Sequence, residues 1–301
     1  MASAVKCKLL LYADDLALLV AGKNAAHIQQ CLSSELQSIR EWLIDNRLSL
    51  HLGKTEAILF GSKRRLNNSE SLNVPCDGQI LTGKSCVKYL GVELDQSLSG
   101  NQIAEAVLRK ANAKLKFVYR QTRQFDMETK KLLTSALIQC HFDYASASWY
   151  SGLTKKYQNR LQTTQNKIVR FLMVVPPRTH IGYSEFEKVK MLPVNLRVIQ
   201  LKLNHIHNIV HGQAPSYLKA SFFLNASRYN TRSGPLSLVI PSSKSFGQSS
   251  FAYTGAIAWN NLRGNIQSII FKSSFMFFKC KVKSFLSSQL RLTELNPFIM
   301  F

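Results

Sequence analysis

Two adjacent carboxylates near the start of the chain are the residues best suited to do chemistry. Asp14 and Asp15 stand between two β-prone apolar runs, Val5–Tyr12 and Leu16–Val20, a pattern that predicts a β-hairpin with acidic residues at its tip. Carboxylate oxygens suit Mg²⁺, which commonly combines one or two carboxylates with substrate phosphates. The sequence therefore predicts a metal-dependent phosphoryl-transfer site, with Asp14 and Asp15 as catalytic residues and metal ligands. Mg²⁺ is the expected cofactor, and Mn²⁺ is an alternative.

Two other interpretations of this region stay open at this point. Paired aspartates are also ordinary turn residues, and an apolar strand that ends in acidic residues resembles the Mg²⁺ strand of P-loop NTPases. Residues 78–85 even carry the Gly-x-x-x-x-Gly-Lys-Ser spacing of a phosphate loop. That motif needs a strand before it and a helix after it. Pro75 and the Asp77-Gly78 turn precede it, and the alternating run Cys86–Leu94 follows, so we interpret the match as coincidental.

The elements that would position the acidic pair follow along the chain. Asn24 is a suitable helix N-cap, and apolar residues then recur at helical spacing, which predicts a helix from Ala25 to about Asp45 that packs on the back of the sheet. Beyond it we expect a strand at Glu56–Phe60, entered through Gly53-Lys54-Thr55, a hairpin at Leu72–Leu81 and a strand at Val87–Leu94.

Three of these segments resemble the reverse transcriptases of non-LTR, LINE-type retrotransposons. The Tyr12-Ala13-Asp14-Asp15 sequence resembles their palm signature, and Asn46–Glu56 resembles their L-x-L-N-x-x-K-T segment. Lys88–Val92 resembles their Y-L-G primer-grip turn. The three segments stand in the family's order, and the relatives they resemble most are jockey-like elements.

The resemblance implies an RNA-directed DNA polymerase, in which a primer 3′-hydroxyl attacks a dNTP. Its partners would be an RNA template and a DNA primer. Lys54 would then lie near the departing pyrophosphate, where a cation neutralises the developing charge. Tyr89, Leu90 and Gly91 would hold the primer, and Gly91 has no Cβ to block a close approach. A surface lysine and an ordinary bulge glycine are the alternatives at Lys54 and Gly91.

One part of the family pattern is not matched. Two-metal phosphoryl transfer needs carboxylates around two cations, and in this family one carboxylate comes from a strand upstream of the hairpin. Eleven residues precede Tyr12 and none of them is acidic, so from the resemblance we expect this chain to lack the fingers and the first catalytic aspartate. We therefore expect that the 301-residue chain alone does not polymerise. A non-catalytic nucleic-acid-binding remnant is the alternative function. A truncated gene model, a pseudogene and a reused fragment stay equally open.

Charge is distributed unevenly along the chain. Residues 1–100 carry 11 Lys and Arg against 10 Asp and Glu, whereas residues 101–301 carry 28 against 7. A neutral part with an acidic site followed by a basic part suits a polymerase palm joined to a nucleic-acid-binding extension. The six cysteines are scattered without a C-x-x-C pair, which favours a reducing compartment. With no signal peptide or membrane-spanning run expected, we predict an intracellular protein, nuclear or cytoplasmic.

Helical periodicity dominates after residue 100. Ile103, Val107, Ala111, Leu115 and Val118 form one apolar face. Basic residues crowd the other faces of this segment and are the predicted phosphate contacts: Arg109, Lys110, Lys114, Lys116, Arg120 and Arg123. Further helices are expected at Met127–His141, Thr154–Val174 and Leu196–His211. We assign Trp149 and Tyr150 to the core, and interpret His205, His207 and His211 as solvated or RNA-facing.

The overall prediction is an α+β fold with a partial antiparallel palm sheet and a packed helix, followed by a mainly helical basic region. Three domains are expected: a partial palm at 1–96, a helical thumb at 97–224, and a linker with a basic-aromatic module at 225–301. The linker is expected at 225–250, where Ser, Asn, Gly and Pro are frequent. The sequence does not define an oligomeric state or a template preference.

Overall fold

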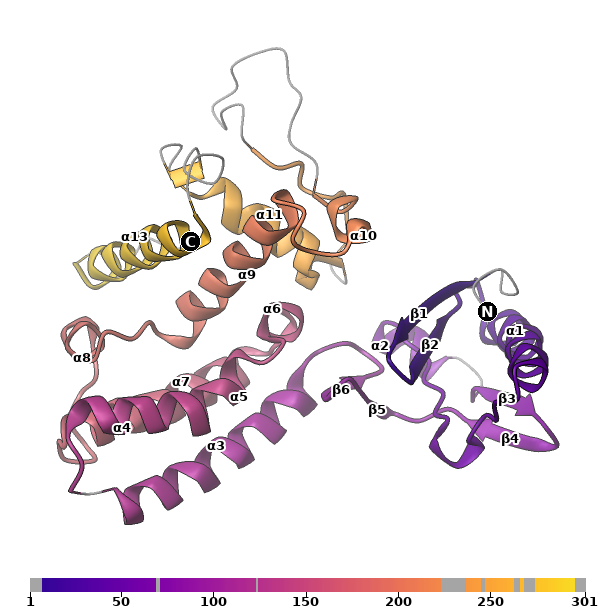
Figure 1. Ribbon diagram of the computed structural model, residues 1–301, viewed down its shortest axis with the longest axis horizontal. Coiled ribbons are helices and arrows are strands. Elements are labelled where there is room, and N and C mark those ends of the chain that lie inside the picture. The colour runs from indigo at the N-terminus through magenta and orange to yellow at the C-terminus, as the bar shows by residue number, and fades with distance from the viewer. Residues whose placement is uncertain are drawn as a thin grey trace. The chain divides into compact units, whose positions relative to one another are not determined.

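The computed structural model describes residues 7–68, 71–122, 124–222, 237–244, 247–262, 266–267 and 274–295. These residues belong to two compact units, Met1–Gln102 and Ile103–Phe301 (Figure 1). Short antiparallel strand pairs and one long helix make up the first unit, and the described elements of the second are almost entirely helical. The predicted α+β class is therefore confirmed. The predicted domain boundaries at 96 and 224 stay predictions.

The first unit consists of three hairpins, one long helix and one short helix. Each hairpin is a separate two-stranded antiparallel sheet in the part of the chain that the structure describes. The strands are β1 (Lys8–Tyr12), β2 (Asp15–Leu19), β3 (Asn73–Cys76), β4 (Gln79–Thr82), β5 (Cys86–Tyr89) and β6 (Val92–Asp95). The helices are α1 (Ala25–Asp45) and α2 (Lys63–Asn67), and a 3₁₀ turn spans Leu52–Lys54.

Helix α1 forms where the sequence predicts it. The Asn24 side chain accepts a hydrogen bond from the His27 backbone N–H at 2.9 Å, which satisfies one of the free donors at the helix start. Leu36 of α1 is buried together with Leu72, Val74 and Cys76, so the apolar face of the helix covers the β3–β4 hairpin. This small cluster is the core of the first unit.

The β1–β2 hairpin also contacts α1 at its base. Burial and the neighbouring Glu35 carboxylate of α1 raise the pKa of the Cys7 thiol, which directly precedes β1. The far end of the hairpin is exposed to solvent, including Leu11 and Tyr12. The hairpin is thus anchored at one end and free at its tip.

Two predictions for the first unit are wrong. Glu56–Phe60 does not form a strand, because its backbone pairs only at a single bridge between Ala57 and Gly83. The segment Val87–Leu94 is not one strand but a hairpin, since Leu90 and Gly91 turn with φ of 46° and 79°. Two consecutive left-handed residues are the geometry of a type I′ turn, whose twist matches that of the flanking strands.

The second unit is built from helices. Those before residue 222 are α3 (Asn101–Gln121), α4 (Met127–Thr134), α5 (Cys140–Asp143), α6 (Ser146–Trp149), α7 (Lys155–Met173), α8 (Tyr183–Lys188), α9 (Val194–Val210) and α10 (Ser216–Lys219). A π-helical turn at Ser135–Gln139 joins α4 to α5, and a 3₁₀ turn spans Tyr150–Gly152. Later elements are a 3₁₀ turn at Gly247–Ser249, α11 (Phe251–Asn260) and α13 (Phe275–Leu295).

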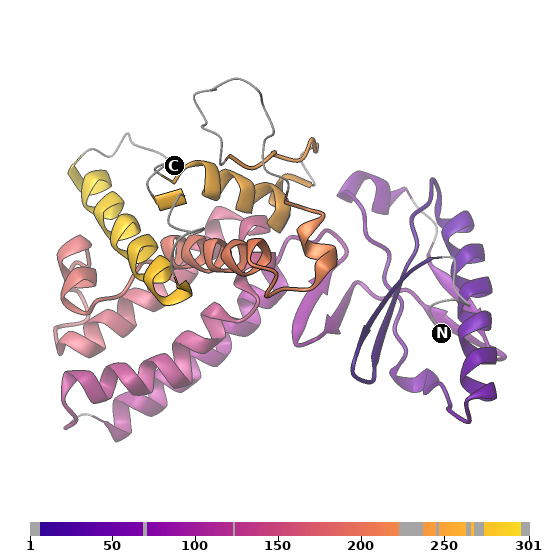
Figure 2. The ribbon, with the colours of Figure 1, turned by 45° about the horizontal axis from the view of Figure 1, so that its top comes forward.

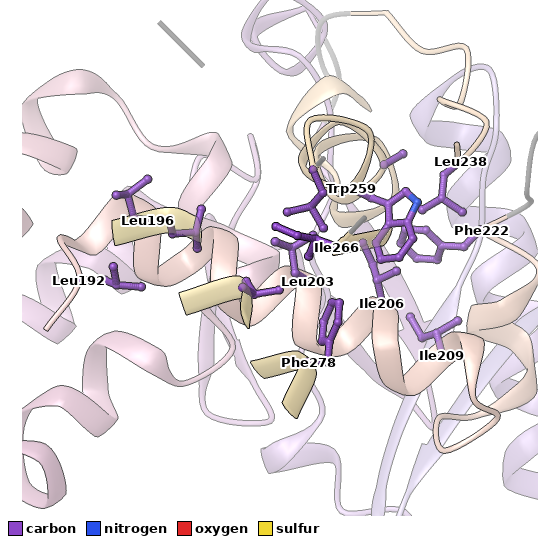
Figure 3. Close-up of a cluster of buried hydrophobic side chains, with 14 residues drawn as sticks. Leu192, Leu196, Leu203, Ile206, Ile209, Phe222, Leu238, Trp259, Ile266 and Phe278 are labelled. Carbon is purple, nitrogen blue, oxygen red and sulfur yellow. The ribbon is translucent and has the colours of Figure 1, made fainter. Parts of the chain in front are cut away.

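One hydrophobic core of this unit surrounds α9. Leu203 and Ile206 of α9 are fully buried against Trp259 of α11 and Phe278 of α13 (Figure 3). Helices α11 and α13 both pack on α9 (Figure 1). Elements on either side of residue 224 therefore share one core. The 225–250 segment, predicted as a linker, lies mostly outside the described residues.

The prediction of solvated or RNA-facing histidines is wrong for His207. Its side chain is only 2% exposed and stacks on His211, with ring centroids 4.1 Å apart. The rings of Phe275 and Phe278 lie 5.2 and 4.9 Å from it. Burial lowers the pKa of His207, and the neighbouring His211 lowers it further. The prediction for Trp149 is confirmed, since that side chain is buried.

Among the described residues, no helix combines the length and the apolar character that crossing a bilayer requires.

Candidate active site and nucleic-acid interface

The predicted catalytic aspartates lie at the tip of the β1–β2 hairpin. Tyr12 pairs directly with Asp15, so the loop between the strands contains only Ala13 and Asp14. Ala13 adopts a left-handed conformation with φ of 52°, which reverses the chain. Both carboxylates are exposed. Within the part of the chain that the structure describes, neither side chain is engaged in a hydrogen bond or an ion pair.

The hairpin tip provides only some of the ligands that a hard divalent cation needs. Two adjacent exposed carboxylates offer the oxygen ligands that such an ion prefers, with room for water and phosphate oxygens. Asp14 and Asp15 have no third acidic, histidine or cysteine side chain grouped with them among the described residues. A two-metal site needs more ligands than this pair provides.

Lys54 ends the 3₁₀ turn and is exposed. The chain after it is held by two backbone hydrogen bonds, from Lys84 N–H to the Ala57 carbonyl at 2.8 Å and from Gly61 N–H to the Gln96 carbonyl at 3.0 Å. These bonds tie the Lys54 segment to the loops that flank the β5–β6 hairpin. The predicted strand is absent, but the segment is fixed.

Tyr89, Leu90 and Gly91 form the tip of the β5–β6 hairpin. Tyr89 and Leu90 are half-buried, whereas Gly91 is exposed with a left-handed backbone. Both ribbon views place the β1–β2 hairpin between α1 and the β5–β6 hairpin (Figure 2). No hydrogen bond or ion pair in the described part of the chain joins the side chains of Asp14, Asp15 and Lys54. The structure therefore gathers these elements in one unit without linking their functional groups.

The phosphate-loop interpretation fails on structure. Residues 79–82 form strand β4 and residues 86–89 form strand β5, so no helix follows Lys84. The Lys84 ammonium instead pairs with the Glu56 carboxylate at 2.5 Å. This ion pair joins two segments of the first unit.

Asp95, which the sequence analysis did not single out, fixes the chain as it approaches α3. Its carboxylate accepts a hydrogen bond from the Ser97 hydroxyl at 2.5 Å and from the backbone N–H groups of Ser97, Ser99 and Gly100 at 3.2 Å. Burial acts to raise the pKa of Asp95, but these hydrogen bonds outweigh it, and the pKa is lowered. The Asp-x-Ser-x-Ser-Gly sequence was the signal from which this turn could have been predicted.

The predicted phosphate contacts lie on helix α3, whose apolar face is buried as expected. Arg109, Lys116 and Arg120 are spaced i, i+7 and i+11, which places them on one stripe of the helix. Lys110 and Lys114 form a second stripe. All five side chains are exposed. Arg123, the sixth predicted contact, lies outside the described residues.

Neighbouring helices define the surroundings of these stripes. Burial lowers the pKa of His141 on α5, and the charges of Lys110 and Lys114 lower it further, so the second stripe lies close to α5. Glu105 of α3 is paired with Arg160 of α7 through two hydrogen bonds of 2.5 and 3.0 Å. The hydrogen bond from Arg160 lowers the pKa of Glu105. The acidic side chain beside the first stripe is thus neutralised.

An aromatic residue that the sequence analysis did not predict joins this surface. Phe117 of α3 is 55% exposed, although its helix neighbours Lys116 and Arg120 are cations. An exposed ring among basic side chains is typical of surfaces that bind unpaired bases by stacking. Its position outside the apolar 3.6-residue periodicity of α3 was the signal that could have identified it.

Comparison with known proteins confirms the resemblance drawn from the sequence. Residues 1–94 match the family described as reverse transcriptase (RNA-dependent DNA polymerase). The chain is also similar to the RNA-directed DNA polymerase from mobile element jockey of Drosophila funebris, with 23% identity over 168 residues. That match covers 55% of this chain and 18% of the polymerase, so the chain spans less than a fifth of that relative. No solved structure gives a significant match.

Proposed function

We propose that this chain provides the second part of a non-LTR reverse transcriptase palm, followed by a basic helical region that binds the template and primer. The observation that carries the proposal is the pair of exposed carboxylates at the tip of the β1–β2 hairpin, with Asp14 in the two-residue turn and Asp15 opposite Tyr12. Reverse transcriptases use divalent metal ions, and Mg²⁺ suits this ligand pair best. The intact enzyme would join a primer 3′-hydroxyl to a dNTP.

Each residue has a distinct role in the proposal. Asp14 and Asp15 would hold a cation that brings the phosphates of the nucleotide to the hairpin tip. Lys54 would offset the charge that develops on the departing pyrophosphate. The exposed backbone of Gly91 would let a primer strand approach the β5–β6 turn closely. The two basic stripes of α3 would contact phosphates without reading bases.

The chain by itself is proposed to bind nucleic acid without extending a primer. Asp14 and Asp15 alone would hold one cation weakly, and two-metal transfer needs a further carboxylate. Non-catalytic binding is therefore the second candidate function for this chain. It is favoured by the excess of 28 basic over 7 acidic residues in 101–301 and by the exposed cations of α3.

A binding and extension assay separates the two functions. A labelled RNA template with an annealed DNA primer is mixed with the chain at several Mg²⁺ and Mn²⁺ concentrations. We expect binding with no extension, and a cation-dependent part of the binding that Asp14→Asn with Asp15→Asn removes. Primer extension that depends on Asp14 would instead make the chain a complete polymerase. Binding that does not depend on the cation at all would support only the second function, non-catalytic nucleic-acid binding.

A further inference from the structure

A cavity in the second unit is lined by residues that lie outside α3. It has a volume of about 370 Å³ and opens between α7, the start of α8 and the start of α9. Proteins bind small molecules in pockets of roughly 300 to 1,000 Å³, so this cavity has room for a single nucleotide and not for a duplex. Nothing in the proposed polymerase mechanism uses it.

Amide side chains dominate the lining of this cavity. They are Gln158, Asn159, Gln162 and Asn166 of α7 and Asn195 of α9. An amide offers both hydrogen-bond donors and an acceptor. Among the described residues that line the cavity there is no carboxylate, and Lys155 is the one cation. The lining is therefore polar, carries one positive charge, and can donate as well as accept hydrogen bonds.

Part of this lining is already fixed by the fold. Gln162 Oε1 accepts from the Val194 N–H at 3.0 Å, and Gln162 Nε2 donates to Asn166 Oδ1 at 2.8 Å. Gln158 Nε2 donates to the Leu153 carbonyl at 3.3 Å. These bonds hold the amides in place while leaving Gln158 Oε1 and the Asn166 Nδ2 donors for a ligand. Such preorganisation reduces the entropic cost of binding.

Aromatic groups complete the cavity. The rings of Tyr150, Tyr183 and Phe186 line it together with the aliphatic surface of Ile181 and Pro193. Burial raises the pKa of Tyr150 to about 12, so its hydroxyl stays a hydrogen-bond donor at any physiological pH. The carboxylates of α8 are engaged locally, since Glu187 accepts from the Tyr183 hydroxyl at 2.7 Å and Glu185 from the Gly182 N–H at 2.9 Å.

We propose that this cavity binds one unpaired base of a single-stranded nucleic acid. A base has an edge of mixed donors and acceptors, which amides match, and an apolar face, which aromatic rings match. Lys155 at the rim is placed to meet the adjoining phosphate. The strongly basic composition of residues 101–301 supplies the attraction for the strand. RNA and DNA strands share this chemistry, and the inference does not require polymerase activity.

Binding of abasic oligonucleotides to the full-length chain tests the proposal. The probes are a short labelled single strand, as RNA and as DNA, and matched strands that each lack one base. A stacked and hydrogen-bonded base is worth about 10-fold in affinity, so we expect one position at which base removal weakens binding by about that factor. The fully paired duplex of the same strand hides its bases and serves as the reference probe.

Two variants connect this effect to the cavity. Asn159→Ala with Asn195→Ala removes two exposed amides that form no hydrogen bond within the described part of the chain. This variant should lose about 10-fold on the intact strand and lose nothing more on the abasic strand, because the two changes remove one interaction. Lys155→Ala should weaken strand binding more than Lys156→Ala, its exposed neighbour outside the cavity. Unchanged thermal unfolding confirms that the variants fold.

The opposite results would refute the proposal. These are equal binding of all abasic strands by the wild type, or an equal loss by the amide variant on intact and abasic strands. A variant that weakens duplex binding as much as single-strand binding would also refute it. The effect is separable from the function of α3, whose cations should govern duplex binding instead.

Discussion

Tyr12 and Asp15 lie directly opposite each other across the β1–β2 hairpin, at the last residue pair before the turn. Cross-strand partners project from the same face of a sheet, so the exposed phenol ring and the second carboxylate share one side of the tip. Asp14 occupies the turn beside them. This arrangement puts an aromatic ring next to two carboxylates at an exposed tip of the first unit.

The first prediction concerns the first basic stripe of α3. Replacing Arg109, Lys116 and Arg120 together with alanine should weaken duplex binding and lower the slope of log K against log salt concentration by about 2 to 3, because each phosphate contact contributes about 0.9. Filter binding at several salt concentrations measures this slope. The control removes three exposed cations of α2, Lys63, Arg64 and Arg65. Equal slopes for the two triple variants would contradict the prediction that these α3 cations contact phosphates.

The second prediction compares two glycines in equivalent turns. Gly91 and Gly78 both close two-residue hairpin turns, with φ of 79° and 72°. Alanine at either position should lower the free energy of unfolding by about 1 kcal/mol, because a Cβ is strained in the left-handed region. Only Gly91→Ala should also weaken binding of a primed template, because the proposed primer contact is at the β5–β6 turn and not at the β3–β4 turn. Urea unfolding and primed-template titrations measure the two effects, and equal binding by both variants would contradict the proposed primer contact.

The sequence predicts those features that neighbouring residues determine, and it fails where a feature depends on residues far along the chain. Helix α1 begins and ends as predicted, because Asn24 and the apolar repeat lie within the helix itself. The Glu56–Phe60 strand fails because a strand needs a partner, and only Gly83 pairs with this segment. At Leu90-Gly91 the residue pattern predicted a continuous strand, since leucine rarely adopts positive φ, whereas the resemblance to the primer-grip turn pointed to the turn that the structure has.

The same distinction applies to the functional groups. The position of the hairpin aspartates follows from a short motif, and that of the α3 cations follows from helical periodicity, so both positions were predicted. His207 was placed wrongly because the rings that bury it belong to α13, far along the chain. The amide-lined cavity was not predicted at all, because Asn159 and Asn195 come from different helices and meet only in the folded unit.

The third prediction concerns Lys202, a buried lysine of α9. Its ammonium donates to the Ser151 hydroxyl at 2.5 Å and to the Thr254 hydroxyl at 2.7 Å, and burial lowers its pKa to about 8 from 10.5. A buried charge without a charged partner is costly. Lys202→Met should therefore raise the free energy of unfolding at pH 7 by about 1 to 3 kcal/mol.

The sign of the pH dependence provides the check. Between pH 8 and 10.5 the unfolded chain binds more protons at this lysine than the folded chain does, so wild-type stability should rise with pH across that window. The rise should disappear in Lys202→Met and persist in Lys167→Met, which changes an exposed lysine of α7. Denaturant unfolding at a series of pH values measures it. A rise of equal size in Lys202→Met would assign the pH dependence to another group.

The most direct measurement is the location of bound Mn²⁺ by paramagnetic broadening of backbone amide signals in the first 100 residues. If the hairpin tip holds a divalent cation, broadening should centre on residues 12–16 and disappear in Asp14→Asn with Asp15→Asn. It should persist in Asp45→Asn, which alters an exposed carboxylate at the end of α1. Broadening that centres elsewhere, or that survives the loss of both hairpin carboxylates, would contradict the proposed metal site.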